Sequence, residues 1–212
     1  MKRLSLTLGV LVLTAMPAFA HHPLNGLPME TFIHGVLSGI GHPLLGFDHL
    51  FFVIAVGIAA VYTAYARRAP AAYIAAMLLG CLMMSFGTNL PLKEFIIALS
   101  LLVVGAAVLS GRALGLVPAL VLFAGFGLFH GSAFGDTIAD QEAGVNTSVL
   151  VGYLIGLGLV QYTIAVLAGY CVKRFMQAGQ ATAINARLAG ALVAGIGLFL
   201  TLETIEGFIL GA

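Results

Sequence analysis

The sequence has few charged residues, since only 8% of its 212 residues are Asp, Glu, Lys or Arg, whereas soluble domains average about 25%. Hydrophobic residues make up 61% of the chain, and its mean hydropathy is +1.10. This composition excludes an ordinary soluble domain and predicts an all-α, polytopic membrane protein. Acidic and basic residues nearly balance, so neither nucleic acid nor a broad anionic surface is expected as a partner.

Cysteine and the common catalytic motifs are also scarce. The two cysteines, Cys81 and Cys171, lie in apolar runs and form no CxxC pair, which argues against a disulfide framework. The chain has no P-loop, so it does not hydrolyse ATP through one, and neither His-Glu-x-x-His nor the GxSG motif of rhomboid-type proteases occurs. The histidines cluster near one membrane face, which disfavours a bis-histidine haem protein. We therefore expect no enzyme and no organic cofactor.

The first twenty residues have the pattern of a cleavable signal peptide. Lys2 and Arg3 precede an apolar centre, and Ala18-Phe19-Ala20 gives a small-x-small cleavage site. The expected mature chain begins at His21, and an uncleaved first span is the alternative.

Long apolar runs predict six transmembrane helices in a single domain that covers residues 21–212. Each run holds roughly 18 to 26 residues, enough to cross a hydrocarbon core of about 30 Å. Residues 21–42 are expected to form a short outer lead-in, in which 30–41 is amphipathic or re-entrant. The predicted spans are 43–66, 71–88, 91–109, 116–135, 147–172 and 186–209.

The distribution of basic residues orients these spans in the inner membrane. A cleaved signal places the new N-terminus in the periplasm, and six spans then place the C-terminus there as well. The predicted cytoplasmic loops contain Arg67, Arg68, Arg112, Lys173, Arg174 and Arg187, whereas Lys93 is the one basic residue of the outer segments. This asymmetry is the one that the positive-inside rule expects.

With this topology, ionisable residues from distant parts of the sequence share one depth, near the periplasmic face. Such residues are costly in a membrane and usually functional. Imidazole suits divalent transition metals, and carboxylates supply the compensating charge. We therefore predict a metal site formed by His42, Asp48, His49, His130, Asp136 and Glu94.

Other polar residues are weaker candidates for the same chemistry. Glu203 and Glu206 are one turn apart near the same face, where they could attract a cation or exchange protons. After signal cleavage, His21 and His22 would form a chelating terminus. Met77, Cys81 and Met84 form one stripe that suits either Cu(I) or ordinary packing. Gln161 and Tyr162 either line a pathway or bond across helices.

Two stretches resemble the signatures of the HupE/UreJ family. His42-Pro-Leu-Leu-Gly-Phe-Asp48-His49 is similar to its H-x5-D-H motif, and Phe129-His130-Gly131-Ser132-Ala133-Phe134-Gly135-Asp136 is similar to F-H-G-x-[AV]-x-G-E. The resemblance covers the whole chain and implies nickel or cobalt uptake, with His42, Asp48, His49 and His130 handling the metal. Asp136 departs from the glutamate of the second motif and leaves the choice of metal open.

These observations together predict an uptake permease that captures nickel or cobalt at the periplasmic face and passes it through the helix bundle. Copper, zinc and iron stay open as alternative ions. A membrane metal-binding accessory or sensor protein without transport is the alternative function. The expected partners are the metal ion, membrane lipid, and further subunits or cytoplasmic metal chaperones.

Overall fold

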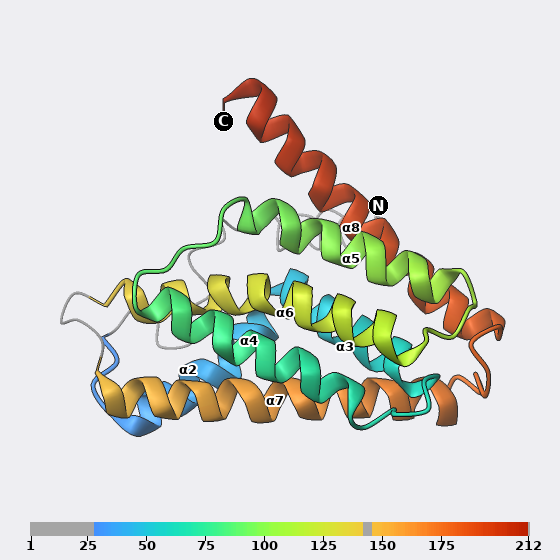
Figure 1. The fold of residues 1–212 in the computed structure, drawn as a ribbon, viewed down its shortest axis with the longest axis horizontal. Coiled ribbons are helices and arrows are strands. Elements are labelled where there is room, and N and C mark those ends of the chain that lie inside the picture. The colour runs from blue at the N-terminus through green and yellow to red at the C-terminus, as the bar shows by residue number, and fades with distance from the viewer. Residues whose placement is uncertain (1–27, 142–145, 212) are drawn as a thin grey trace, which may run out of the picture.

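The computed structural model describes residues 28–141 and 146–211, and these two ranges contain seven helices and no strand. The predicted signal peptide, His21 and His22 lie outside the described residues. The all-α prediction is confirmed. In chain order the helices are α2 Phe32–Leu45, α3 Phe47–Val61, α4 Ala69–Ser85, α5 Lys93–Leu109, α6 Leu116–Ala139, α7 Thr147–Arg174 and α8 Ile184–Leu210 (Figure 1).

Three of these helices, α6, α7 and α8, are long and apolar enough to cross a membrane. The pair α2 and α3 passes the same test when it is counted as one broken span, and α4 is apolar but shorter. The chain is therefore a helical membrane protein. The predicted spans from residue 71 onward begin and end within about one helical turn of α4 to α8.

The first predicted span, 43–66, differs from the structure. The chain instead forms α2 and α3, which are bent by 82° at Gly46. Pro43 lies inside the last turn of α2 and has no N–H to continue the helix, and Gly46 has an extended backbone with φ −84° and ψ 100°. Hydropathy does not detect this break, because both helices are apolar.

Close helix pairs carry much of the fold, and glycines allow their backbones to touch. Gly35 and Gly39 of α2 face α7, where added Cβ atoms would lie 2.1 Å from the carbonyl oxygen of Val149 and 2.2 Å from that of Tyr153. The contacts move along both helices in the same direction, so α2 and α7 are parallel. The expected lead-in is thus a helix packed into the bundle. Helices α4 and α6 are also parallel, with Gly131 of α6 against Met77 of α4.

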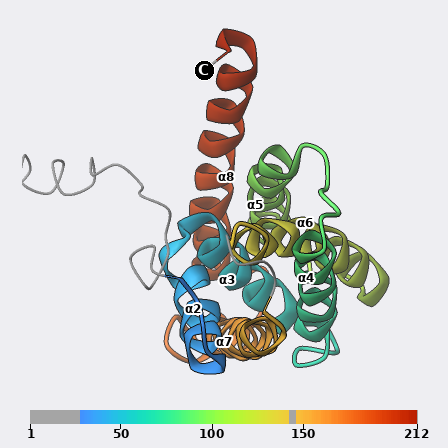
Figure 2. The same cartoon turned by 90° about the vertical axis from the view of Figure 1, so that its left-hand side faces the viewer.

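The third close pair, α5 and α8, is antiparallel. Gly105 of α5 faces Ala194 of α8, while Gly197 of α8 contacts Leu101 and Leu102 of α5. The buried residues of α8 end at Thr201. Its remaining turns extend beyond the other helices, as both views show (Figures 1 and 2).

Helix α3 occupies the centre, where it contacts each of the other six described helices. We call the end of the bundle at which α2, α5 and α7 begin the Asn146 end. The opposite end, at which α3 and α7 finish, is called the Arg174 end.

Candidate metal-handling site

The break between α2 and α3 brings two predicted site residues together. His42 lies in the last turn of α2 and His49 in the first turn of α3, with ring centroids 6.0 Å apart. A Cβ atom at position 46 would lie 2.9 Å from the His49 ring and 3.3 Å from a carboxylate oxygen of Asp48. Gly46 therefore leaves the space in which the His49 ring and the Asp48 carboxylate lie.

His49 and His130 form a buried chain of hydrogen bonds with Ser100. The Ser100 hydroxyl donates to the carbonyl oxygen of Ile97 at 2.6 Å, so it accepts from Nε2 of His130 at 2.9 Å. In a neutral His130, Nδ1 then holds the lone pair and accepts from Nδ1 of His49 at 2.7 Å. The chain leaves the lone pair of neutral His49 on Nε2.

Asp48 lies beside this nitrogen. Its Oδ2 is 3.8 Å from Nε2 of His49, and its Oδ1 accepts a 2.8 Å hydrogen bond from the His49 backbone N–H. The Asp48 side chain is 30% exposed, whereas that of His49 is 7% exposed. A cation that reaches His49 can therefore meet a carboxylate and an unprotonated imidazole nitrogen together.

Two hydroxyl groups hold the His42 ring in place. Nδ1 of His42 lies 2.9 Å from the Tyr153 hydroxyl and 3.0 Å from the Thr137 hydroxyl. Tyr153 donates its only hydroxyl hydrogen to the carbonyl oxygen of Phe134 at 3.0 Å, so it accepts from His42. Nδ1 of His42 is thus held between the Tyr153 and Thr137 hydroxyls.

Aromatic rings enclose the histidines within the bundle. Phe52 stacks on His130 with centroids 4.1 Å apart, and Phe134 lies 5.0 Å from His42 and 4.2 Å from His49. Helix α6 ends at Ala139, nine positions after His130, which places His130 about 14 Å from that end. The cluster therefore lies deeper than the predicted rim, because α2 is part of the bundle and α6 continues past Gly135.

Two other predicted ligands lie nearer the Asn146 end. Asp136 forms an ion pair with Lys93, whose Nζ donates to Oδ1 at 2.6 Å and also to Oδ2. Glu94 is exposed at the start of α5 and interacts electrostatically with His49 and Asp48. Asp136 is therefore paired with a lysine, whereas Glu94 is near enough to His49 and Asp48 to interact with their charges.

The glutamates of α8 and the sulfur-containing stripe of α4 have surroundings of their own. Glu203 and Glu206 are exposed on α8 beyond its last buried residue. Met77 and Cys81 are fully buried and lie directly against the backbone of Gly131 on α6. Their contacts are those of ordinary helix packing.

The clustered side chains do not close around one point. Within residues 28–141 and 146–211, no group of three or more His, Cys, Asp or Glu side chains is arranged to hold a metal ion. His42, Asp48 and His49 are neighbours, and both nitrogens of His130 bind other side chains.

Three residues that orient the imidazoles were not among the predicted site residues. Ser100, Thr137 and Tyr153 each bind a histidine that is distant in the sequence, at separations of 30, 95 and 111 residues. A buried phenol needs a hydrogen-bond partner, and this is the one signal in the sequence that could have drawn attention to Tyr153.

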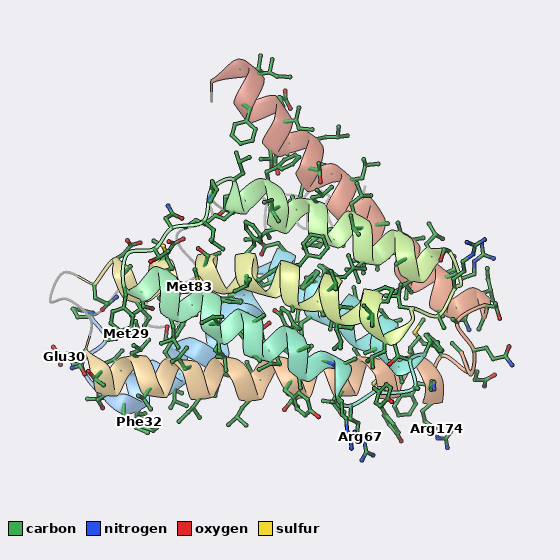
Figure 3. All side chains as sticks on the ribbon, viewed as in Figure 1. Met29, Glu30, Phe32, Arg67, Met83 and Arg174 are labelled. Carbon is green, nitrogen blue, oxygen red and sulfur yellow. The ribbon has the colours of Figure 1, made fainter. Side chains whose placement is uncertain are left out.

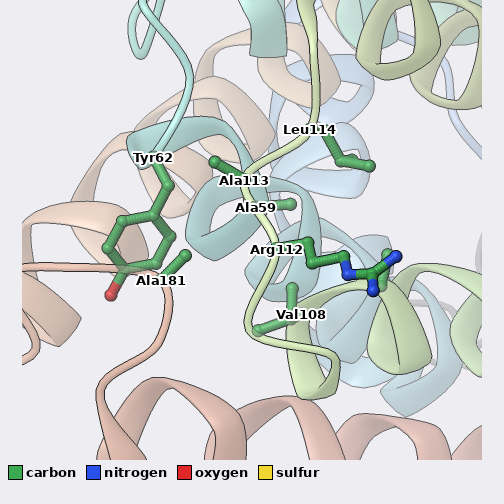
Figure 4. Close-up of a pocket in the computed structure, with 8 residues that line it drawn as sticks. Ala59, Tyr62, Val108, Arg112, Ala113, Leu114 and Ala181 are labelled. Carbon is green, nitrogen blue, oxygen red and sulfur yellow. The ribbon is translucent and has the colours of Figure 1, made fainter.

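Charge is distributed unevenly between the two ends. Glu30 lies at the Asn146 end, while Arg67 and Arg174 lie toward the opposite end (Figure 3). These two arginines and Lys173 line a cavity of about 360 Å³ between α3 and α7. Arg112 lines a cavity of about 10 Å³ beside Tyr62 and Leu114, also near the Arg174 end (Figure 4).

Comparison with known proteins agrees with the motifs found in the sequence. The chain is 30% identical over 190 residues to Protein HupE of Rhizobium leguminosarum bv. viciae, which covers 85% of this chain and 88% of that protein. No solved structure matches it. The family described as HupE / UreJ protein matches residues 9–200, and these residues include the whole histidine cluster. The chain belongs to the HupE/UreJ family.

Proposed function

We propose that this protein takes up a divalent transition-metal ion, nickel or cobalt, through the inner membrane. The observation that carries the proposal is the hydrogen-bond chain Ser100–His130–His49, which leaves the Nε2 lone pair of His49 beside the Asp48 carboxylate. Neutral imidazole and carboxylate together suit such ions. The family resemblance points to nickel and cobalt, while copper, zinc and iron stay as alternatives.

In this proposal, His49, Asp48 and His42 bind the ion, and His130 orients His49. A ligating histidine commonly donates its other N–H to a neighbour that fixes its tautomer, and His130 is that neighbour here. The three binding side chains lie close without forming a closed cage. Such an open arrangement suits a transporter, since an ion must leave its site as well as enter it.

Six passes through the membrane fit the directions of the packed helices. A broken first span, α2 with α3, runs in the same direction as α7, α4 runs with α6, and α5 runs against α8. Six alternating spans give these directions. The basic residues near the Arg174 end place it in the cytoplasm, and the Asn146 end, like both termini of the mature chain, then faces the periplasm.

The test measures nickel binding by the purified protein and nickel uptake by proteoliposomes. We expect His49→Ala to abolish both, because the ion loses its imidazole and the hydrogen-bond chain loses its end. His34→Ala is the matched control, since His34 lies on α2 and its Nδ1 accepts from the Glu30 backbone instead of joining the cluster. Uptake by His49→Ala at the wild-type rate would exclude this site.

The same experiment separates the alternatives. A wild-type protein that binds nickel but transports none would be a membrane accessory or sensor protein. Competition by cobalt, copper, zinc and iron would rank the ions. Partner subunits and cytoplasmic metal chaperones would be sought only if the purified protein binds without transporting.

A further inference from the structure

A second buried polar pair lies deeper in the bundle than the histidines. Tyr73 of α4 and Gln161 of α7 are both completely buried. The Tyr73 hydroxyl donates a hydrogen bond to Oε1 of Gln161. Nε2 of Gln161 has no hydrogen-bond partner among the described residues.

The pair lies next to the histidine cluster, on its Arg174 side. The Tyr73 ring is 6.3 Å from the His130 ring, and Phe52 contacts both rings. A Cβ atom at Gly127, one turn before His130, would lie 2.8 Å from the carbonyl oxygen of Tyr73. On α7, Gln161 follows Tyr153 by eight residues, or about 12 Å. The polar groups thus form a series along the interior.

Packing alone does not account for this pair. Hydrogen bonds between membrane helices do hold bundles together, and the Tyr73–Gln161 bond could have that role. It leaves the amide N–H groups of Gln161 buried without an acceptor, which is costly, whereas two apolar side chains would leave nothing unpaired. A water molecule that reaches the pair would accept from Nε2, and a hydrated cation that passes the pair brings such water into the bundle.

On the basis of the proposed function, we propose that Tyr73 and Gln161 form a second station for the divalent ion between the histidine cluster and the Arg174 end. The phenol and carboxamide oxygens are neutral ligands, weaker for such an ion than imidazole with carboxylate. The ion therefore passes from a site that captures it to one that releases it. In this conformation the Phe52 ring contacts both the Tyr73 ring and the His130 ring.

The decisive variant replaces both partners, Tyr73→Phe with Gln161→Leu, so that no polar group is left unpaired. Thr163→Val is the matched control, because Thr163 is exposed on the same helix and its hydroxyl binds the carbonyl oxygen of Leu159. Purified full-length proteins are compared for nickel(II) chloride binding, for thermal unfolding, and for nickel uptake in proteoliposomes.

We expect the double variant to unfold at or above the wild-type temperature and to bind nickel with unchanged affinity. Its maximal uptake rate should fall on the order of tenfold with little change in the half-saturating concentration, the result of losing a step after capture. Wild-type uptake by the double variant would overturn the proposal. A lower unfolding temperature with uptake reduced only in proportion to folded protein would overturn it as well, because the pair would then be a structural bond.

A different result would refute the proposed function itself. A wild-type protein that neither binds nor takes up nickel or cobalt would refute the function before any variant is compared. If the wild type does both and the double variant does both equally well, only the second station is refuted.

Discussion

His130 differs from His49 in what its nitrogens do, although both are histidines of one cluster. Ser100 and His49 use both nitrogens of His130, while His49 keeps a lone pair on Nε2. The two sequence motifs predict the same role, metal handling, for both residues. In the proposed site, His49 would bind the ion and His130 would hold the His49 ring in place.

This division predicts different losses on substitution. Removing a neighbour that orients a ligand typically lowers metal affinity by about 10–100-fold, and we expect a loss in this range for His130→Ala. His130→Asn should lose less, because its carbonyl oxygen can accept from Nδ1 of His49. Titration of the purified variants with nickel measures both effects, and equal losses for Ala and Asn would contradict the orienting role.

Asp136 shows why residue type alone is a limited guide to a site. Its carboxylate is the charge that the second family motif would bring to a metal, yet it pairs with Lys93. The sequence predicted that Lys93 and Asp136 lie near the same membrane face. Nothing in it indicated that the two side chains would form an ion pair.

At the scale of the helices, glycines decide how closely the parts of the site approach. Gly131 follows His130 and touches α4, where an added Cβ atom would lie 1.9 Å from the Met77 carbonyl oxygen. Gly125 lies on the same helix with nothing within 4 Å of such an atom. The two positions therefore form a matched pair.

We expect Gly131→Ala to destabilise the protein by roughly 1–3 kcal/mol, the usual cost of overpacking a core. Backbone atoms cannot yield as a flexible side chain does, so α4 and α6 must separate beside His130. Gly125→Ala should leave stability unchanged or raise it, because alanine favours a helix over glycine. Thermal unfolding in detergent measures both, and a stable Gly131→Ala variant with normal nickel binding would show that the helix contact is not needed.

The helices after residue 71 could be predicted because one property, apolar length, specifies them. The break at Gly46 could not be predicted, because proline and glycine also occur at the ends of unbroken spans. Grouping His42, His49 and His130 needed only their approximate depth. Their partners Ser100, Thr137 and Tyr153 depend on how the helices rotate against each other, which apolar length does not determine.

At the scale of the whole molecule, the proposed six-span topology predicts on which side of the membrane each loop lies. Reporter fusions at Arg68, Arg112 and Gln177 should be cytoplasmic, and a fusion at Gly211 should be periplasmic, because six passes return the chain to the side where it starts. A cytoplasmic reporter at Gly211 would mean that one span has been miscounted. The proposed direction of transport would then have to be revised.

The bend at Gly46 also affects which ions can approach, before any side chain binds them. An unbroken helix would have no free helix end at this depth. The bend, in contrast, places the C-terminal end of α2 beside His42. The C-terminal end of a helix has a partial negative charge, and broken membrane helices use such ends to attract cations. The partial positive charge at the start of α3 is offset by Asp48, which accepts the His49 N–H. The carbonyl end of α2 and the Asp48 carboxylate together therefore favour a cation over an oxyanion at this point in the membrane.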